Sequence, residues 1–143
     1  MRAFAPDCER VDVSGAEDGY RLLLERLWAD GEAFLIVEHD VEIHKWVVPE
    51  LAQCPEDWCL YPYAGMGGQS LEGALGCTRF SAALIRDEPG LIGSLPVRNW
   101  RRLDCELLGK LRQSDRMPHV HQPPVLHHHV YGAQGCACGL AHE

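Results

Sequence analysis

A short apolar run that ends abruptly in charged residues places the strongest constraint on this chain. Phe34 to Val37 are four consecutive apolar residues, and Glu38, His39 and Asp40 follow them directly. A short apolar run of this kind predicts a buried strand. In an open α/β sheet, ligands bind beyond the carboxyl ends of the strands. The sequence therefore places a candidate binding site at Glu38 and Asp40.

The two carboxylates of this segment indicate a metal site. Glu38 and Asp40 are two residues apart, so an extended strand would direct both side chains to one face of the sheet. Carboxylate oxygens are the ligands that hard divalent cations such as Mg²⁺ or Mn²⁺ prefer. A solvated turn is the alternative interpretation, because acidic residues are common at strand ends.

Length and composition limit the classes of protein to consider. The chain has 143 residues, of which 46% are hydrophobic and 24% charged, as expected for one globular domain. A formal net charge of -8 argues against a broad nucleic-acid-binding surface. No apolar stretch is long enough to span a membrane, and the first ten residues lack the apolar core of a signal peptide. We therefore expect a cytoplasmic protein, and its seven cysteines favour free thiols.

Helical and extended patterns alternate along the chain. Helices are expected within 14–30, 44–53 and 100–111 and from Ser81 onward, and extended segments at 34–37, 58–63, 74–80 and 118–130. Ser14 and Ser81 are the expected N-caps of their helices. The alternation predicts an α/β fold with a mixed, mostly parallel sheet flanked by helices. We expect one domain over residues 1–131 and a loosely ordered tail over 132–143.

Two further groups of residues are candidates for a functional site. Asp104 lies one helical turn after Trp100 and on the same side of the predicted helix, where it could act as a general base or be a solvated surface charge. His127 and His129 alternate along an extended segment and so share a face. Either histidine could complete a metal site with Asp40, although an exposed histidine run is the simpler alternative.

The order of these motifs resembles that of the GT-A glycosyltransferases, in particular small family 2-type proteins of phage and bacterial genomes. Glu38-His39-Asp40 is similar to the D-x-D motif of that family. The segment 75–81 is similar to its acceptor-site segment, Leu103-Asp104-Cys105-Glu106-Leu107 to its E-D-x-x-L motif, and 125–127 to its late histidine-bearing strand. The resemblance covers residues 20–129.

This resemblance implies a metal-dependent, inverting transfer of a sugar from a nucleotide-sugar donor to an acceptor hydroxyl. It implies that Asp104 is the catalytic base and that Asp40 and His127 are ligands of Mn²⁺ or Mg²⁺; the spacing of the histidine run adds His129 as a candidate ligand. The remaining candidates, which would contact donor or acceptor, are Glu38, Arg79 and Trp100. The acceptor is not identified; modified phage DNA is one candidate, and no membrane partner is expected.

Two departures from the family pattern leave alternatives open. Only 37 residues precede Glu38, too few for the nucleotide-binding βαβ unit of the family, so we expect a truncated GT-A architecture. Leu103 also stands where the family often has Glu. The chain could therefore form a homodimer that shares a site, or be an inactive glycosyltransferase-like binding protein. It could also be a non-catalytic Zn²⁺ module built from His119, His121, His127, Cys136 and Cys138.

Overall fold

A computed structural model describes residues 8–64, 70–71, 75–96 and 99–128. The helices are α1 (Gly19–Asp30), α2 (Val47–Gln53), α3 (Ala82–Asp87) and α4 (Leu103–Gln113), with 3₁₀ turns η1 (Ile92–Ser94) and η2 (Trp100–Arg102). The strands are β1 (Phe34–Val37), β2 (Val41–Glu42), β3 (Trp58–Leu60), β4 (Tyr63–Ala64), β5 (Ser70–Leu71), β6 (Cys77–Phe80), β7 (His119–Val120) and β8 (Val125–His127). The expected tail, 132–143, lies outside the described residues. Within the described ranges, none of the helices has both the length and the apolar character needed to cross a membrane.

The strands form two four-stranded sheets, with the orders β1-β6-β3-β7 and β2-β8-β4-β5. The expected mixed α/β fold with flanking helices is confirmed, but the expectation of a mostly parallel sheet is wrong. Among the described strands, only β3–β7 and β4–β8 are parallel, and the other four pairings are antiparallel. Parallel neighbours need a crossover connection, and the long segment through α3 and α4 provides it for β7 and β8. β6 instead pairs in the antiparallel direction with both of its neighbours, β1 and β3.

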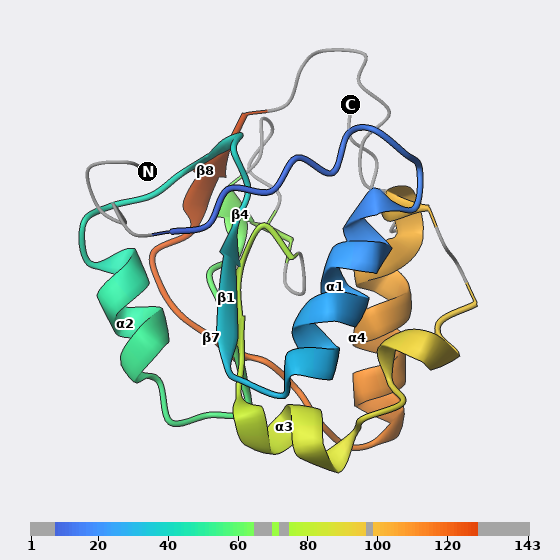
Figure 1. Ribbon diagram of the computed structural model, residues 1–143. Helices are drawn as coiled ribbons and strands as arrows, with labels where there is room; N and C mark the ends of the chain where they lie inside the picture. The colour runs from blue at the N-terminus through green and yellow to red at the C-terminus, as the bar shows by residue number, and fades with distance from the viewer. Residues whose placement is uncertain (1–7, 65–69, 72–74, 97–98, 129–143) are drawn as a thin grey trace.

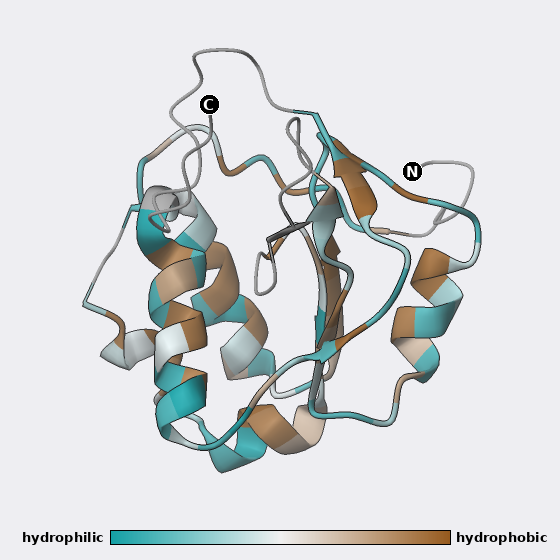
Figure 2. Cartoon of the chain, turned by 180° about the vertical axis from the view of Figure 1, so that it is seen from behind, coloured by the Kyte–Doolittle hydropathy of each residue, from teal (hydrophilic) through white to brown (hydrophobic). Residues whose placement is uncertain are grey.

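Helices cover both faces of the strand layer (Figure 1), with α1 and α4 on one side and α2 on the other. The alternation of side chains along β1 matches this arrangement. Phe34 and Ile36 pack against the core that contains the leucines of α1 and α4, whereas Leu35 and Val37 pack against the core beneath α2. Seen from behind, the helices carry brown, hydrophobic segments between teal, hydrophilic ones (Figure 2). The buried residues of α4 are Leu103, Leu107 and Leu111. Because both faces of β1 are packed against apolar cores, its sequence is a continuous apolar run and not an alternating one.

The predicted helix ends are partly confirmed. Ser81 caps α3, because its hydroxyl accepts a hydrogen bond of 3.0 Å from the Leu84 amide. Ser14 does not cap the first helix: α1 begins at Gly19, and the Ser14 hydroxyl instead donates a 2.6 Å bond to Asp12. This local bond gives Ser14 an alternative partner to the helix amides.

Candidate functional site

The predicted acidic segment and the late histidine meet where the two sheets adjoin. β1 ends at Val37, and the amide of Val41 donates a 3.1 Å hydrogen bond to the carbonyl of Glu38, which closes a tight turn. β2 follows and pairs with β8 in a register that sets Val41 opposite His127. The His127 Nε2 atom consequently lies 3.0 Å from the Asp40 Oδ2 atom. One ligand atom from each of Glu38, Asp40 and His127 falls within 4.8 Å of the others.

The local geometry that brings the carboxylates together differs from the expected one. An extended strand through Glu38 and Asp40 was the basis of the prediction, but the chain turns at these residues. The turn itself directs both side chains toward the end of β8. The three residues therefore converge through a turn and a strand register, and not through the period of a single strand.

Burial and the repulsion from Asp40 make this site unfavourable for the negative charge of Glu38, whereas His127 favours the negative charge of Asp40. Burial raises the pKa of Glu38, and the charge of Asp40 raises it further. Burial also acts to raise the pKa of Asp40, but the hydrogen bond and charge of His127, together with the charge of His39 and a backbone hydrogen bond, outweigh it, and the net shift is downward. The Asp40 side chain is 30% exposed and that of His127 is 9% exposed. The site is therefore mostly buried but reaches solvent at Asp40.

Two tyrosines and a glycine surround these ligands. Sequence reasoning missed the tyrosines, and it included Gly76 only as part of the segment 75–81 that is similar to an acceptor-site segment. The Tyr63 ring stacks on His127 with a centroid distance of 4.3 Å. A Cβ atom at Gly76 would overlap the Tyr63 hydroxyl and would lie 2.9 Å from Glu38 Oε2. Burial, followed by the charge of Glu38, raises the pKa of both Tyr63 and Tyr20. In the sequence, both tyrosines have the spacing of ordinary core residues, so no motif marks them.

Two buried polar atoms at the site have no hydrogen-bond partner within the described part of the chain: Asp40 Oδ1 and the Tyr20 hydroxyl. The Tyr20 hydroxyl lies close to Glu38, but it makes no hydrogen bond of standard geometry. Buried polar atoms normally have a partner, which can be a bound ion. A divalent cation would meet this need at Asp40, and its charge would offset the repulsion between the carboxylates. The residues present therefore fit a hard divalent cation.

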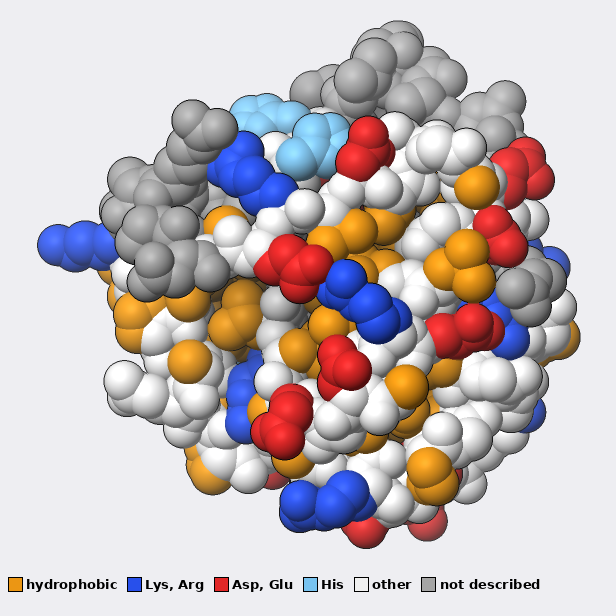
Figure 3. All heavy atoms as spheres, in the orientation of Figure 1, with side chains coloured by type: hydrophobic (Ala, Val, Ile, Leu, Met, Phe, Trp, Pro, Cys, Tyr) orange, Lys and Arg blue, Asp and Glu red, His pale blue; other side chains and the backbone are white. Residues whose placement is uncertain are grey.

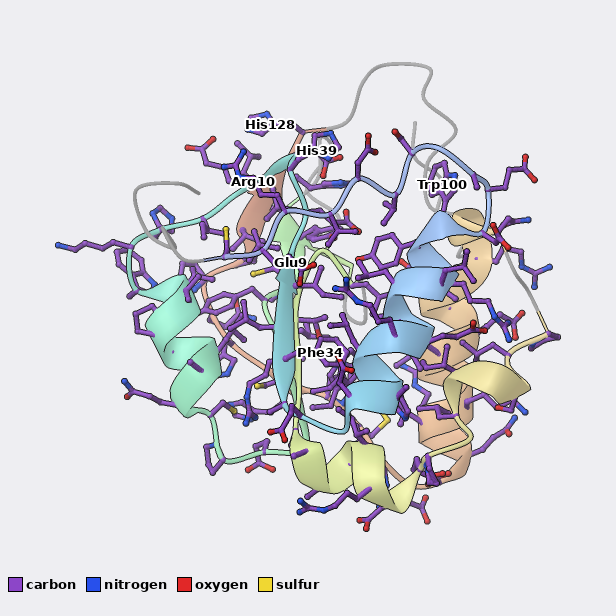
Figure 4. The ribbon with its side chains drawn as sticks, in the orientation of Figure 1. Glu9, Arg10, Phe34, His39, Trp100 and His128 are labelled. Carbon is purple, nitrogen blue, oxygen red and sulfur yellow. The ribbon has the colours of Figure 1, made fainter. Side chains whose placement is uncertain are left out.

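Asp104 and Trp100 lie at the same end of the molecule as these ligands. Asp104 is in the first turn of α4, and its charge contributes to the raised pKa of Glu38, although less than burial and Asp40 do. Its Oδ1 atom accepts a 2.9 Å hydrogen bond from the Cys105 amide. Trp100 is 46% exposed and lies beside the upper ends of α1 and α4 (Figure 4). The structure thus brings Asp104 into electrostatic range of the candidate ligands.

Arg79 is not part of this site. It shares the α2 side of β6 with Cys77, and the register sets it opposite Leu35, away from the Glu38 end of β1. Its Nη1 atom donates to the carbonyls of Cys54 and Glu56 at 3.0 and 3.1 Å. The expected donor or acceptor contact of Arg79 therefore has no support from its position. His129, the other expected metal ligand, lies outside the described residues.

A second imidazole–carboxylate pair lies at the surface next to the site. His128 Nε2 is 3.0 Å from Glu42 Oε2, and the two side chains are 59% and 67% exposed. Histidine side chains gather at the upper edge of the face in Figure 3, and Figure 4 labels His39 and His128 there. This exposed pair combines the same two kinds of side chain as Asp40–His127 but is not buried. A variant of it can therefore serve as a control for variants of the buried pair.

Comparison of the chain with known protein families, with curated proteins and with solved structures finds no match. The assignment of a function therefore depends on the geometry of the site and on the sequence motifs.

Proposed function

We propose that this protein binds a divalent cation, Mn²⁺ or Mg²⁺, through Glu38, Asp40 and His127. The observation that carries the proposal is the convergence of their ligand atoms within 4.8 Å. One buried Asp40 oxygen, Oδ1, also has no partner among the described residues. A set of carboxylates with one imidazole suits Mn²⁺ better than Mg²⁺, which prefers oxygen alone.

We infer further that the site serves the transfer of a sugar from a nucleotide-sugar donor. When bound, the cation would neutralise negative charge on the diphosphate leaving group. Asp104 accepts the proton of an acceptor hydroxyl; the hydroxyl oxygen bonds to the anomeric carbon as the bond from that carbon to the diphosphate breaks. The configuration at this carbon inverts. The order of the sequence motifs and the charge of Asp104 beside Glu38 support this reaction class.

Calorimetric titration of metal-free protein with Mn²⁺ tests the cation site. We expect saturable binding that Asp40→Asn weakens by at least about tenfold, because this variant loses a charged ligand. Glu42→Gln removes a carboxylate from the exposed pair with His128 and should bind Mn²⁺ as the wild type does. Equal affinity of the wild type and Asp40→Asn would exclude Asp40 as a ligand.

A second experiment separates cation binding from glycosyl transfer. Binding of UDP-sugars is measured with and without Mn²⁺, together with the release of UDP. We expect donor binding that requires Mn²⁺ and is retained in Asp104→Asn, while UDP release in this variant is lost. Mn²⁺ binding without any response to a panel of nucleotide sugars would retain the cation site and refute the transferase proposal.

A further inference from the structure

A second cluster of potential ligands lies beneath α2. Cys54 is the residue that follows α2, Cys59 is the middle residue of β3, and His121 follows β7. Their ligand atoms lie within 4.8 Å of one another. The parallel pairing of β3 with β7 brings them together, and the His121 amide extends it with a 2.8 Å bond to the carbonyl of Leu60.

Contacts of the His121 ring fix its orientation, and only one of its two nitrogens has a partner among the described residues. Its Nδ1 atom lies 2.9 Å from Glu50 Oε1, and the Tyr61 ring stacks on it at 5.2 Å. The side chain is only 9% exposed, and its Nε2 atom is buried without a partner among the residues that the structure describes. Metal-binding histidines characteristically use one nitrogen for a carboxylate and the other for the metal.

The two cysteines are buried free thiols. Burial raises the pKa of Cys59 to about 12, and the neighbouring Cys54 also raises it, whereas Arg79 acts to lower it. A metal ion binds cysteine as the thiolate, so its binding here would release a proton from each thiol that it ligates.

We propose that Cys54, Cys59 and His121 form a Zn²⁺ site in which Glu50 acts as a positioning residue. Two sulfurs and one imidazole nitrogen are a known ligand set of zinc, with the fourth position taken by water. The ion would join the end of α2 to β3 and to the segment after β7. Its soft sulfur ligands distinguish this site from the site of Glu38, Asp40 and His127, which suits harder cations.

Cobalt substitution tests the sulfur ligands without relying on a variant. Metal-free, reduced wild-type protein titrated with Co²⁺ should develop a sulfur-to-cobalt charge-transfer absorption that Zn²⁺ abolishes by competition. Cys59→Ser should lose most of this absorption, and Cys77→Ser, which changes a buried thiol outside the cluster, should retain it. Absence of the absorption in the wild type would refute the site.

Two comparisons identify which residues hold the ion. The double variant Cys136→Ser/Cys138→Ser should retain the cobalt absorption; its loss would place the sulfur ligands in that segment and overturn the proposal. Asp40→Asn should also retain it, so failure of the Mn²⁺ site and failure of this one are distinguishable.

The positioning role of Glu50 gives a milder variant that should fold normally, since its side chain is 43% exposed. We expect Glu50→Gln to weaken Zn²⁺ binding by about 10- to 100-fold, measured by competition with a chelating dye. Glu42→Gln, which alters the exposed pair with His128, should have wild-type affinity. Unchanged affinity of Glu50→Gln, or a Cys54–Cys59 disulfide in mass spectra of the freshly purified protein, would contradict the proposal.

Discussion

Glu38 is destabilising in the protein without a metal ion. Its carboxylate is removed from water and faces the negative charge of Asp40, and both effects raise its pKa. Functional sites typically contain residues that lower the stability of the fold but are needed for activity. Glu38 is therefore the residue at which stability and ion binding should respond in opposite directions.

We predict that Glu38→Gln raises the free energy of unfolding of the metal-free protein by about 0.5–2 kcal/mol at neutral pH. The amide keeps the shape of the side chain and removes the repulsion with Asp40. Urea denaturation in the presence of a chelator measures the change, and Mn²⁺ titration of the same variant should show weaker binding. A variant that is less stable than the wild type and binds Mn²⁺ equally well would contradict both assignments.

Gly76 is required for close packing at the back of the site. We predict that Gly76→Ala destabilises the protein by about 1–3 kcal/mol, because overpacking forces neighbouring groups to move and Tyr63 stands against this position. Gly109→Ala is the control, since nothing lies within 4 Å of its added Cβ in α4. That change should stabilise by about 0.5–1 kcal/mol through helix propensity. Thermal denaturation of both variants checks the contrast in sign.

At the scale of elements, the sequence predicts the strands and helices better than their pairing. Periodicity marks α4, and the serine before α3 marks its start, because both depend on neighbouring residues. The antiparallel entry of β6 depends on contacts between distant segments, which no local pattern encodes. For this reason the position of Arg79, whose guanidinium contacts the carbonyls of Cys54 and Glu56, could not be predicted, whereas the proximity of Asp40 to His127 could be expected.

Arg21 connects α1 to the turn η1, and we predict that Arg21→Leu destabilises the protein by about 2–4 kcal/mol. Its side chain is buried and donates hydrogen bonds to the carbonyls of Leu95 and Gly93 at 2.6 and 3.3 Å. Leucine would leave these carbonyls without that donor. Arg26→Leu removes an exposed ion pair with Glu9 and should change stability by less than about 1 kcal/mol. Equal effects in urea denaturation would contradict this role of Arg21.

At the scale of the whole molecule, a buried cysteine thiol makes the free energy of unfolding depend on pH in the alkaline range. Burial raises the pKa of the Cys77 thiol from 9.0 to about 12, so the folded chain retains a proton that the unfolded chain releases. The contribution to stability is complete below pH 9 and is lost as the pH rises from 9 to 12.

The cysteines of the chain differ in their bonding. Four of the described cysteines are free thiols, whereas Cys105 is disulfide-bonded.

We predict that Cys77 contributes a loss of about 1.4 kcal/mol of stability per pH unit in this range. Denaturation of metal-free protein at several pH values between 8 and 11 measures the slope for the wild type and for Cys77→Ala. The variant is expected to be less stable at pH 8, because it leaves a small cavity, and to show a shallower slope. Parallel slopes would show that Cys77 does not titrate as expected.

The register of β2 with β8 has a consequence for the order of events during synthesis. His127 lies 87 residues after Asp40, and it reaches the carboxylates only when the last strand pairs with β2. A nascent chain that still lacks this strand presents acidic side chains without their imidazole partner. Binding of the proposed cation through all three residues therefore requires nearly all of the described fold, so uptake of Mn²⁺ would report completed folding.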